Sequence, residues 1–173
     1  MSKNAPDSGK INKSLENINR LTPQQFDIHI ASDGSWFHEG GLIGRPALVR
    51  LFASVLHRHD DGTFWLVTPA ERGQITVEDA PFIGVALAVT GEGVDRELRL
   101  TTNIGDTVLI DRDHALHMQT GDDHEDRPYV RIRNQLDAKL SRPVFYELAA
   151  LAEPDENGRL GVWSAGCFFP LMD

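Results

Sequence analysis

The chain has 173 residues, of which 40% are hydrophobic and 25% are charged, a composition typical of a folded globular protein. Its 17 basic and 26 acidic residues give a net charge of −9. Nucleic-acid backbones and anionic membrane surfaces both select basic faces, so we expect neither generic nucleic-acid binding nor membrane association. A small anionic ligand is still compatible with this charge, because a few arginines in a cleft can dominate the local field.

Cysteine content and the apolar segments bear on the cellular compartment. Cys167 is the single cysteine, lies in an apolar run typical of a buried strand, and cannot form an intramolecular disulfide. The first ten residues lack the apolar core of a signal peptide, and the longest apolar stretch, 83–89, is too short to cross a bilayer. We therefore expect a cytoplasmic protein.

The first half of the chain alternates between short helices and hairpins. Residues 1–21 read as a polar tail followed by a short amphipathic helix over 14–21. The alternation over 26–30 predicts a strand, and Asp33-Gly34 predicts the turn of a hairpin that returns over 35–39. A helix starts at Arg45-Pro46, with one apolar stripe made by Leu48, Leu51, Phe52 and Val55. Strands are then expected over 63–67, 75–77 and 82–89.

The second half is expected to continue with the same kinds of element. Strands are predicted over 98–100 and 108–110, followed by a polar, acidic loop over 111–128 and a strand over 129–133. A helix starts at Ser141-Arg142-Pro143 and continues through Ala152. The turn at 156–158 leads into a strand over 160–164.

The two helix starts belong to an internal duplication. The segment 44–53 matches 141–150 with Arg45 aligned on Arg142, 97 positions apart, and the following turn and strand match at a separation of 96. The fold class predicted is α+β, with two structurally related units of antiparallel strands and one helix each. We place an N-terminal domain at 22–82 and a C-terminal domain at 83–173.

A family resemblance rests on seven short motifs that occur in order along the chain. They are Asp33-Gly34-Ser35-Trp36, Arg45-Pro46, Thr68-Pro69-Ala70-Glu71, Val77-Glu78-Asp79-Ala80-Pro81-Phe82, Thr102-Asn103-Ile104-Gly105-Asp106, Pro128-Tyr129-Val130 and Gly161-Val162-Trp163-Ser164-Ala165-Gly166. The chain resembles the bacterial DUF1285 family over nearly its whole length after the first ten residues. The resemblance implies two α+β domains with repeated motifs, the C-terminal one superficially similar to pleckstrin-homology folds. It also implies a role in signal transduction and a ligand site at the domain interface, with nucleotide-like molecules among the candidate ligands.

The candidate ligand site lies at the seam between the two units. Arg45 and Arg142 start the equivalent helices, where free N–H groups and a guanidinium together favour an anion. Arg131 and Arg133, two apart on one strand, are expected on one face. Stacking surfaces and carboxylates for ribose hydroxyls complete the predicted set, namely Trp36, Tyr129, Trp163, Glu71, Glu78 and Asp79. The alternative is that these arginines pair with the carboxylates and clamp the two units together.

Other chemistries have weaker signals. His114, His117 and His124 lie among acidic residues, but this spacing is a weak metal signal, and we expect no metal and no cofactor. Glu78 and Asp79 are adjacent on a strand and should point to opposite faces, so they do not form a catalytic pair. A ligand-binding or sensory module is thus the main hypothesis. An enzyme acting on a small anionic substrate, or an adaptor that binds a protein partner, is the alternative.

Overall fold

The computed structural model describes residue 17 and residues 20–172 of the chain. Within these residues it contains fifteen strands, two α-helices and one short 3-10 helix, η1 (Gly93–Asp95). The helix expected over 14–21 lies mostly outside the described residues. None of the described helices is long and apolar enough to span a membrane.

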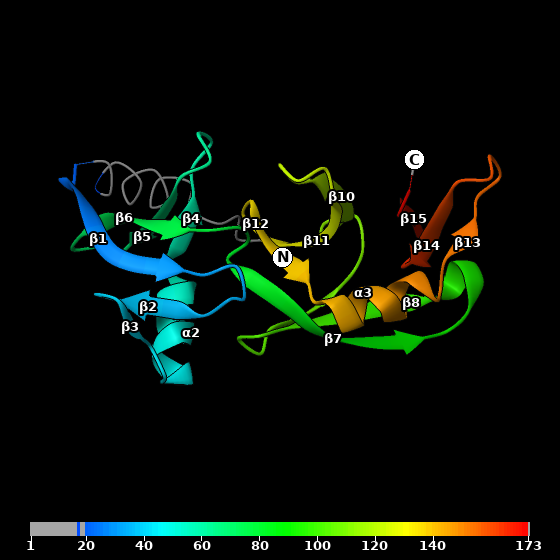
Figure 1. The fold of residues 1–173 in the computed structure, drawn as a ribbon, viewed down its shortest axis with the longest axis horizontal. Coiled ribbons are helices and arrows are strands. Elements are labelled where there is room, and N and C mark those ends of the chain that lie inside the picture. Colours follow the sequence, from blue (N-terminus) through cyan, green and yellow to red (C-terminus); the bar gives the residue numbers. More distant parts are fainter. Residues whose placement is uncertain (1–16, 18–19, 173) are drawn as a thin grey trace, which may run out of the picture.

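The first unit is built on one six-stranded sheet, on the left in Figure 1. Its strands run in the spatial order β3-β2-β1-β6-β5-β4, with β1 and β6 parallel and all other neighbours antiparallel. The elements are β1 (Pro23–Ile30), β2 (Trp36–His38), β3 (Gly41–Leu42), α2 (Pro46–Ser54), β4 (Leu56–Arg58), β5 (Phe64–Val67) and β6 (Arg72–Val77). Helix α2 connects β3 to β4.

The second unit carries another six-stranded sheet and a smaller three-stranded sheet. The larger sheet has the spatial order β10-β11-β12-β7-β8-β9. The strands that come first and last along the chain, β7 and β12, pair in parallel at its centre. The elements are β7 (Phe82–Thr90), β8 (Glu97–Thr102), β9 (Thr107–Leu109), β10 (Leu116–Thr120), β11 (Asp126–Arg133), β12 (Leu136–Leu140), α3 (Arg142–Ala149), β13 (Glu153–Pro154), β14 (Leu160–Ser164) and β15 (Cys167–Pro170). Helix α3 packs on β7, above it in Figure 1.

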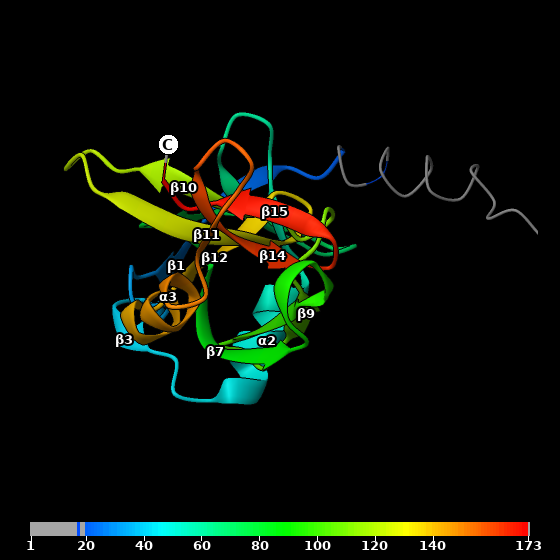
Figure 2. The same ribbon diagram turned by 90° about the vertical axis from the view of Figure 1, so that its right-hand side faces the viewer.

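In the structure, each copy of the predicted repeat consists of a meander, a helix and a second meander. Strands β1–β3, helix α2 and strands β4–β6 correspond to strands β10–β12, helix α3 and strands β13–β15. In the first copy the two meanders join through the β1–β6 ladder, and in the second copy β15 packs beside β10 (Figure 2). The second unit differs by an additional meander, β7–β9, which pairs with β12. The predicted α+β class with two related units is confirmed.

Short Asx turns form several of the hairpins where the sequence predicts them. Asp33 Oδ1 accepts a hydrogen bond from the Ser35 N–H at 2.9 Å, and Gly34 takes a φ of +86° that only glycine adopts without strain. Asp61 Oδ1 accepts the Thr63 N–H in the same way at 2.9 Å. These local bonds set the hairpin registers, and through them the faces on which side chains emerge.

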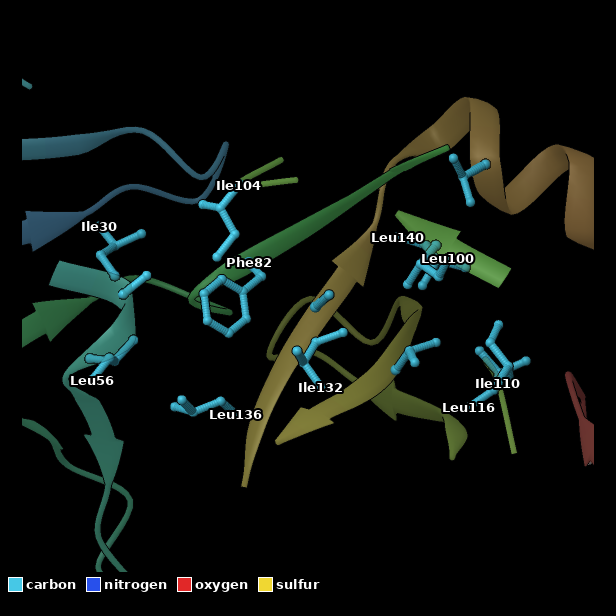
Figure 3. Packing of buried hydrophobic residues seen from close by; sticks show 14 of the residues in the cluster. Ile30, Leu56, Phe82, Leu100, Ile104, Ile110, Leu116, Ile132, Leu136 and Leu140 are labelled. Carbon is cyan, nitrogen blue, oxygen red and sulfur yellow. The ribbon is translucent and has the colours of Figure 1, made fainter. Parts of the chain in front are cut away.

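One hydrophobic core extends through both units. Figure 3 shows the Phe82 ring, fully buried at the start of β7, between Ile30 and Leu56 of the first unit and Leu136 of the second. Ile104, on the β8–β9 turn, also enters this region and is 8% exposed. The two units are therefore fused by packing, which fixes the geometry of any site along their seam.

Two predictions from the sequence pattern are wrong in detail. Leu51 is 60% exposed, so the buried face of α2 is turned toward Val49, Phe52 and Ala53. The segment 111–128 is not a loop, because it contains β10 and the start of β11. Its acidic residues lie in the bend before β10 and around the exposed tip of the β10–β11 hairpin, which explains the loop-like composition.

Candidate functional site

A cavity of about 670 Å³ lies at the seam between the two units and is here called the seam cavity. The first unit contributes Ser32 from the β1–β2 turn, and the segment between β6 and β7, residues 78–81, forms an elbow that contributes Glu78 and Asp79. The second unit contributes the β10–β11 hairpin together with Tyr129 and Lys139. Three of the predicted site residues, Glu78, Asp79 and Tyr129, therefore meet at the predicted interface.

Asp79 is the centre of a hydrogen-bonded group of three side chains. Tyr129 Oη donates to Asp79 Oδ1 at 2.7 Å, and Lys139 Nζ donates to Asp79 Oδ2 at 2.7 Å. Burial, reinforced by the hydrogen bond to Asp79, raises the pKa of the Tyr129 hydroxyl above its ordinary value. The phenol therefore remains a neutral hydrogen-bond donor, fixed to the elbow that links the units.

Glu78, the neighbour of Asp79 on the elbow, also lines the seam cavity but is held by the first unit. It accepts hydrogen bonds from His29 Nε2 and from the Ser32 N–H, each at 2.8 Å. The His29 hydrogen bond, followed by that of Ser32, lowers the pKa of the Glu78 carboxyl. The two adjacent carboxylates thus tie the elbow to different units.

The polar face of the β10–β12 meander continues away from the cavity. Arg131 Nε donates to Asp137 Oδ1 at 2.5 Å, and His117 Nε2 lies 3.5 Å from Asp137 Oδ2. The hydrogen bond with Asp137, opposed by burial, raises the pKa of the His117 imidazole. Burial alone would raise the pKa of Asp137, but the bonds from His117 and Arg131 lower it. The His117 ring also stacks on Tyr129, with ring centroids 5.9 Å apart, which links both polar groups.

Charge in the seam cavity is predominantly negative. Four carboxylates line it, from Glu78, Asp79, Asp122 and Asp123, against the two cations Arg127 and Lys139. Arg127 forms an ion pair with Asp123, and Lys139 pairs with Asp79. Both cations therefore already have anionic partners, and the free hydrogen-bonding capacity of the cavity lies mainly in carboxylate oxygens.

Arg142 lines a different cavity, of about 480 Å³, between the start of β11, the end of β12 and α3, here called the α3 groove. Its walls include Arg127 and Lys139, which also line the seam cavity, and the aromatic residues Phe145 and Tyr146. Arg45 directly precedes α2 in the first unit, and Figure 1 shows α2 apart from α3. The expectation that the two arginines share one cleft is wrong.

Four further predicted residues lie outside both cavities. Arg133 donates to the Ala53 carbonyl at the end of α2 and lies over the Phe82 ring, at 5.7 Å from its centroid. The ladder shifts register between Arg131 and Arg133, and the two arginines have different partners. The others are the buried Trp36, the exposed Glu71 and Trp163, which packs edge-on against Phe168. Arg133 thus joins the second unit to the first through a backbone carbonyl, not through a carboxylate as the clamp alternative expects.

Arg127, Lys139 and Asp137 were not predicted from the sequence as site residues. The signal was present in β12, where Asp137 and Lys139 alternate with apolar residues, and in β11, where Arg127 precedes Tyr129 by two positions. Among the described residues, no three histidine, cysteine, aspartate or glutamate side chains are placed to hold one metal ion. His114 instead contacts the Arg131 carbonyl at 3.0 Å.

These features define a two-unit α+β protein whose repeated meanders enclose a polar seam. Family models of the DUF1285 proteins match residues 18–80, as "Domain of unknown function (DUF1285), N-terminal domain", and residues 81–171, as "Protein of unknown function (DUF1285), C-terminal domain". The chain belongs to the DUF1285 family.

Two solved structures are similar to the chain. A DUF1285 family protein from Silicibacter pomeroyi DSS-3 is 38% identical with a TM-score of 0.82, and the match covers 99% of this chain and 90% of that one. A DUF1285 family protein from Shewanella baltica OS155 is 29% identical with a TM-score of 0.55, covering 70% of this chain and 89% of that one. No curated protein matches.

Proposed function

We propose that this protein is a ligand-binding module of bacterial signal transduction, acting in the cytoplasm, with its site in the seam cavity. The observation that carries the proposal is the group of Asp79, Tyr129 and Lys139, in which the elbow and the second unit share one hydrogen-bonded carboxylate at a cavity of about 670 Å³. Polar groups that converge on a concave site between domains are the usual form of a small-molecule site.

The chemistry of the cavity favours a ligand that presents hydroxyl hydrogens. Carboxylates at Glu78 and Asp79 accept hydrogen bonds from vicinal hydroxyls, as in a sugar or the ribose of a nucleotide-like molecule. An anionic group on that ligand would have to displace Asp123 from Arg127 or Asp79 from Lys139. The Arg127–Asp123 pair is the more exposed of the two, and exposed ion pairs are worth about 0–1 kcal/mol, so an exchange at Arg127 costs little.

A ligand at Asp79 would act on the connection between the units. Asp79 lies on the elbow and is held by Lys139 of β12, so a ligand hydroxyl that competes for its oxygens loosens the tie to β12. The elbow would then have two states, one with the Asp79–Lys139 bond and one without it. The difference in ligand affinity between these states would set the population of each. This is the physical basis of the proposed sensory role.

Isothermal titration calorimetry with a panel of sugars, nucleosides and nucleotides tests the proposal. We expect one class of these compounds to bind. The single variants Tyr129→Phe and Glu78→Gln should each weaken that binding about tenfold, since each removes a cavity hydrogen bond. Thr76→Ala, an exposed change on the neighbouring strand β6, is the matched control. Equal affinity of the two site variants and the control variant, or no binding by any member of the panel, would refute a site in the seam cavity.

A further inference from the structure

We propose that the α3 groove is a second, separate binding site, which takes a small anion that carries an aromatic or apolar group. It does not depend on the function proposed for the seam cavity. The groove is bounded by the start of β11, the end of β12 and the first turns of α3, and its volume of about 480 Å³ admits a molecule of this size.

The charge of the groove is opposite to that of the seam cavity. Three cations line it, Arg127, Lys139 and Arg142, against two carboxylates, Glu125 and Asp126. Asp126 already accepts a hydrogen bond from Thr120 Oγ1 at 2.6 Å. Because Arg127 and Lys139 are paired with Asp123 and Asp79, the positive charge available to an anion in the groove is that of Arg142.

Arg142 is the cation available to a ligand. Its side chain is exposed, and within residues 20–172 it has no hydrogen-bond or ion-pair partner, whereas Arg127 pairs with Asp123 and Lys139 with Asp79. Arg142 is also the first residue of α3, which has no side-chain cap and no acidic residue in its first turn. The partial positive charge of the helix start therefore adds to that of the guanidinium.

Two aromatic residues line the groove on the same helix as Arg142, at three and four positions after it. Phe145 is half-buried and packs against the core, while Tyr146 is 64% exposed. An exposed tyrosine ring on a rigid helix is a stacking surface whose burial by a ligand is favourable. The groove thus offers donors for an anionic group and a ring face for the rest of the molecule.

The internal repeat provides an independent argument, because the equivalent groove of the first unit is smaller, about 210 Å³, and is partly covered by another segment of the chain. That groove lies at the start of α2, is lined by Leu42 and Val49, and is covered by the β8–β9 turn with Ile104. Arg50 Nε fixes this turn by donating to the Ile104 carbonyl at 2.8 Å. The position is therefore one in which this fold accommodates an inserted group.

The two copies of the groove differ in chemistry as well as size. At the separation of 97 positions, Leu42 of the smaller groove corresponds to Lys139 of the larger one, and Val49 corresponds to Tyr146. Aliphatic side chains suit the apolar Ile104, while a cation and an aromatic ring suit an aromatic anion. The geometry thus points to an external occupant of that class.

Amide NMR titration with phenyl phosphate, phenylacetate, inorganic phosphate and benzyl alcohol tests the site. We expect phenyl phosphate or phenylacetate to shift the amides of Val144 and Tyr146, and the comparison of the two distinguishes a phosphate from a carboxylate group. Inorganic phosphate and benzyl alcohol each supply half of the interaction and should bind more weakly. Added salt should weaken binding of the anions.

Arg142→Ala and Arg45→Ala form a matched pair, because each removes an exposed arginine before a proline at a helix start. We expect about a tenfold loss of affinity in Arg142→Ala and no loss in Arg45→Ala. Tyr146→Ala should also weaken binding while leaving the fold intact, as its side chain is exposed. Equal losses in the two arginine variants, shifts confined to Ser32 and Glu78, or no binding of either aromatic anion would each overturn the proposal.

Discussion

The Lys139 ammonium lies 2.7 Å from Asp79 Oδ2, across the junction between the elbow and the central strand of the second sheet. Both side chains are less than a third exposed, so water screens the pair only in part. Asp79 is also the acceptor for Tyr129, which gives the carboxylate two partners from two neighbouring strands, β11 and β12.

Asp79→Asn should destabilise the protein. The substitution leaves Lys139 without its counter-charge and gives Tyr129 a weaker acceptor, so we expect the free energy of unfolding to fall by about 1–2 kcal/mol. Urea denaturation followed by tryptophan fluorescence measures the change. Asp95→Asn, at an exposed carboxylate of η1, should be neutral, and an equal effect at both positions would contradict the role given to Asp79.

His117 should titrate above the ordinary histidine pKa of about 6.5. The protonated imidazole is favoured by Asp137, so its contribution to stability is complete below the ordinary pKa and is lost as pH rises through the folded-state pKa. Asp137 has a lowered pKa, and its contribution is present above the ordinary aspartate value and lost as pH falls through the folded one. The His117–Asp137 pair therefore stabilises the fold most at pH values between the ordinary pKa of aspartate and the ordinary pKa of histidine.

Histidine NMR titration measures the midpoint of His117 directly. Asp137→Asn removes the charge that does most to raise the pKa of His117, so the midpoint should fall. Asp113→Asn, a nearby exposed carboxylate, should leave the midpoint unchanged. A His117 midpoint that does not respond to Asp137→Asn would disprove the pairing.

Gly73→Ala should destabilise the first sheet. Gly73 is buried in β6, and a Cβ atom at this position would overlap the ring of Phe26 on the neighbouring strand β1. Overpacking of this kind costs about 1–3 kcal/mol, measurable by thermal or urea unfolding. In a Phe26→Ala background the cost should largely disappear, and Gly44→Ala, where no atom lies within 4 Å, is the control.

Ile104→Ala tests the insertion of the β8–β9 turn into the first unit. The side chain is 8% exposed and packs in the shared core, so its truncation should lower the unfolding free energy by about 2–4 kcal/mol. Val94→Ala, at a residue 54% exposed, should change it by less than about 0.5 kcal/mol. A similarly small effect at Ile104 would mean that the turn is not part of the fused core.

Local patterns in the sequence predicted most of the elements but few of their long-range partners. The hairpin at Asp33-Gly34 and both proline-initiated helices follow from short-range chemistry, and each is present. Strand β12 was missed, because its buried Asp137 and half-buried Lys139 break the apolar pattern expected of a central strand. Their burial depends on ion pairs with residues on other strands, which no local pattern shows.

The candidate site was predicted in the same uneven way. Glu78 and Asp79 lie on the elbow and not on a strand, so the period of a strand does not apply to them; they bond to different units but line the same cavity. The register shift between Arg131 and Arg133 was not predicted, and the two arginines bond to different partners. The alignment of Arg45 with Arg142 identified the repeat, but equivalent positions in a duplicated fold need not be neighbours.

The pairing of first and last strands has a consequence for how the chain is made. Each six-stranded sheet has at its centre a ladder between the strand that begins it and the strand that ends it, β1 with β6 and β7 with β12. During synthesis, neither sheet can be completed until its final strand has left the ribosome. Meanders would form early and wait, with their inner edges unpaired, for the closing strand that adds the parallel ladder at the centre of the sheet.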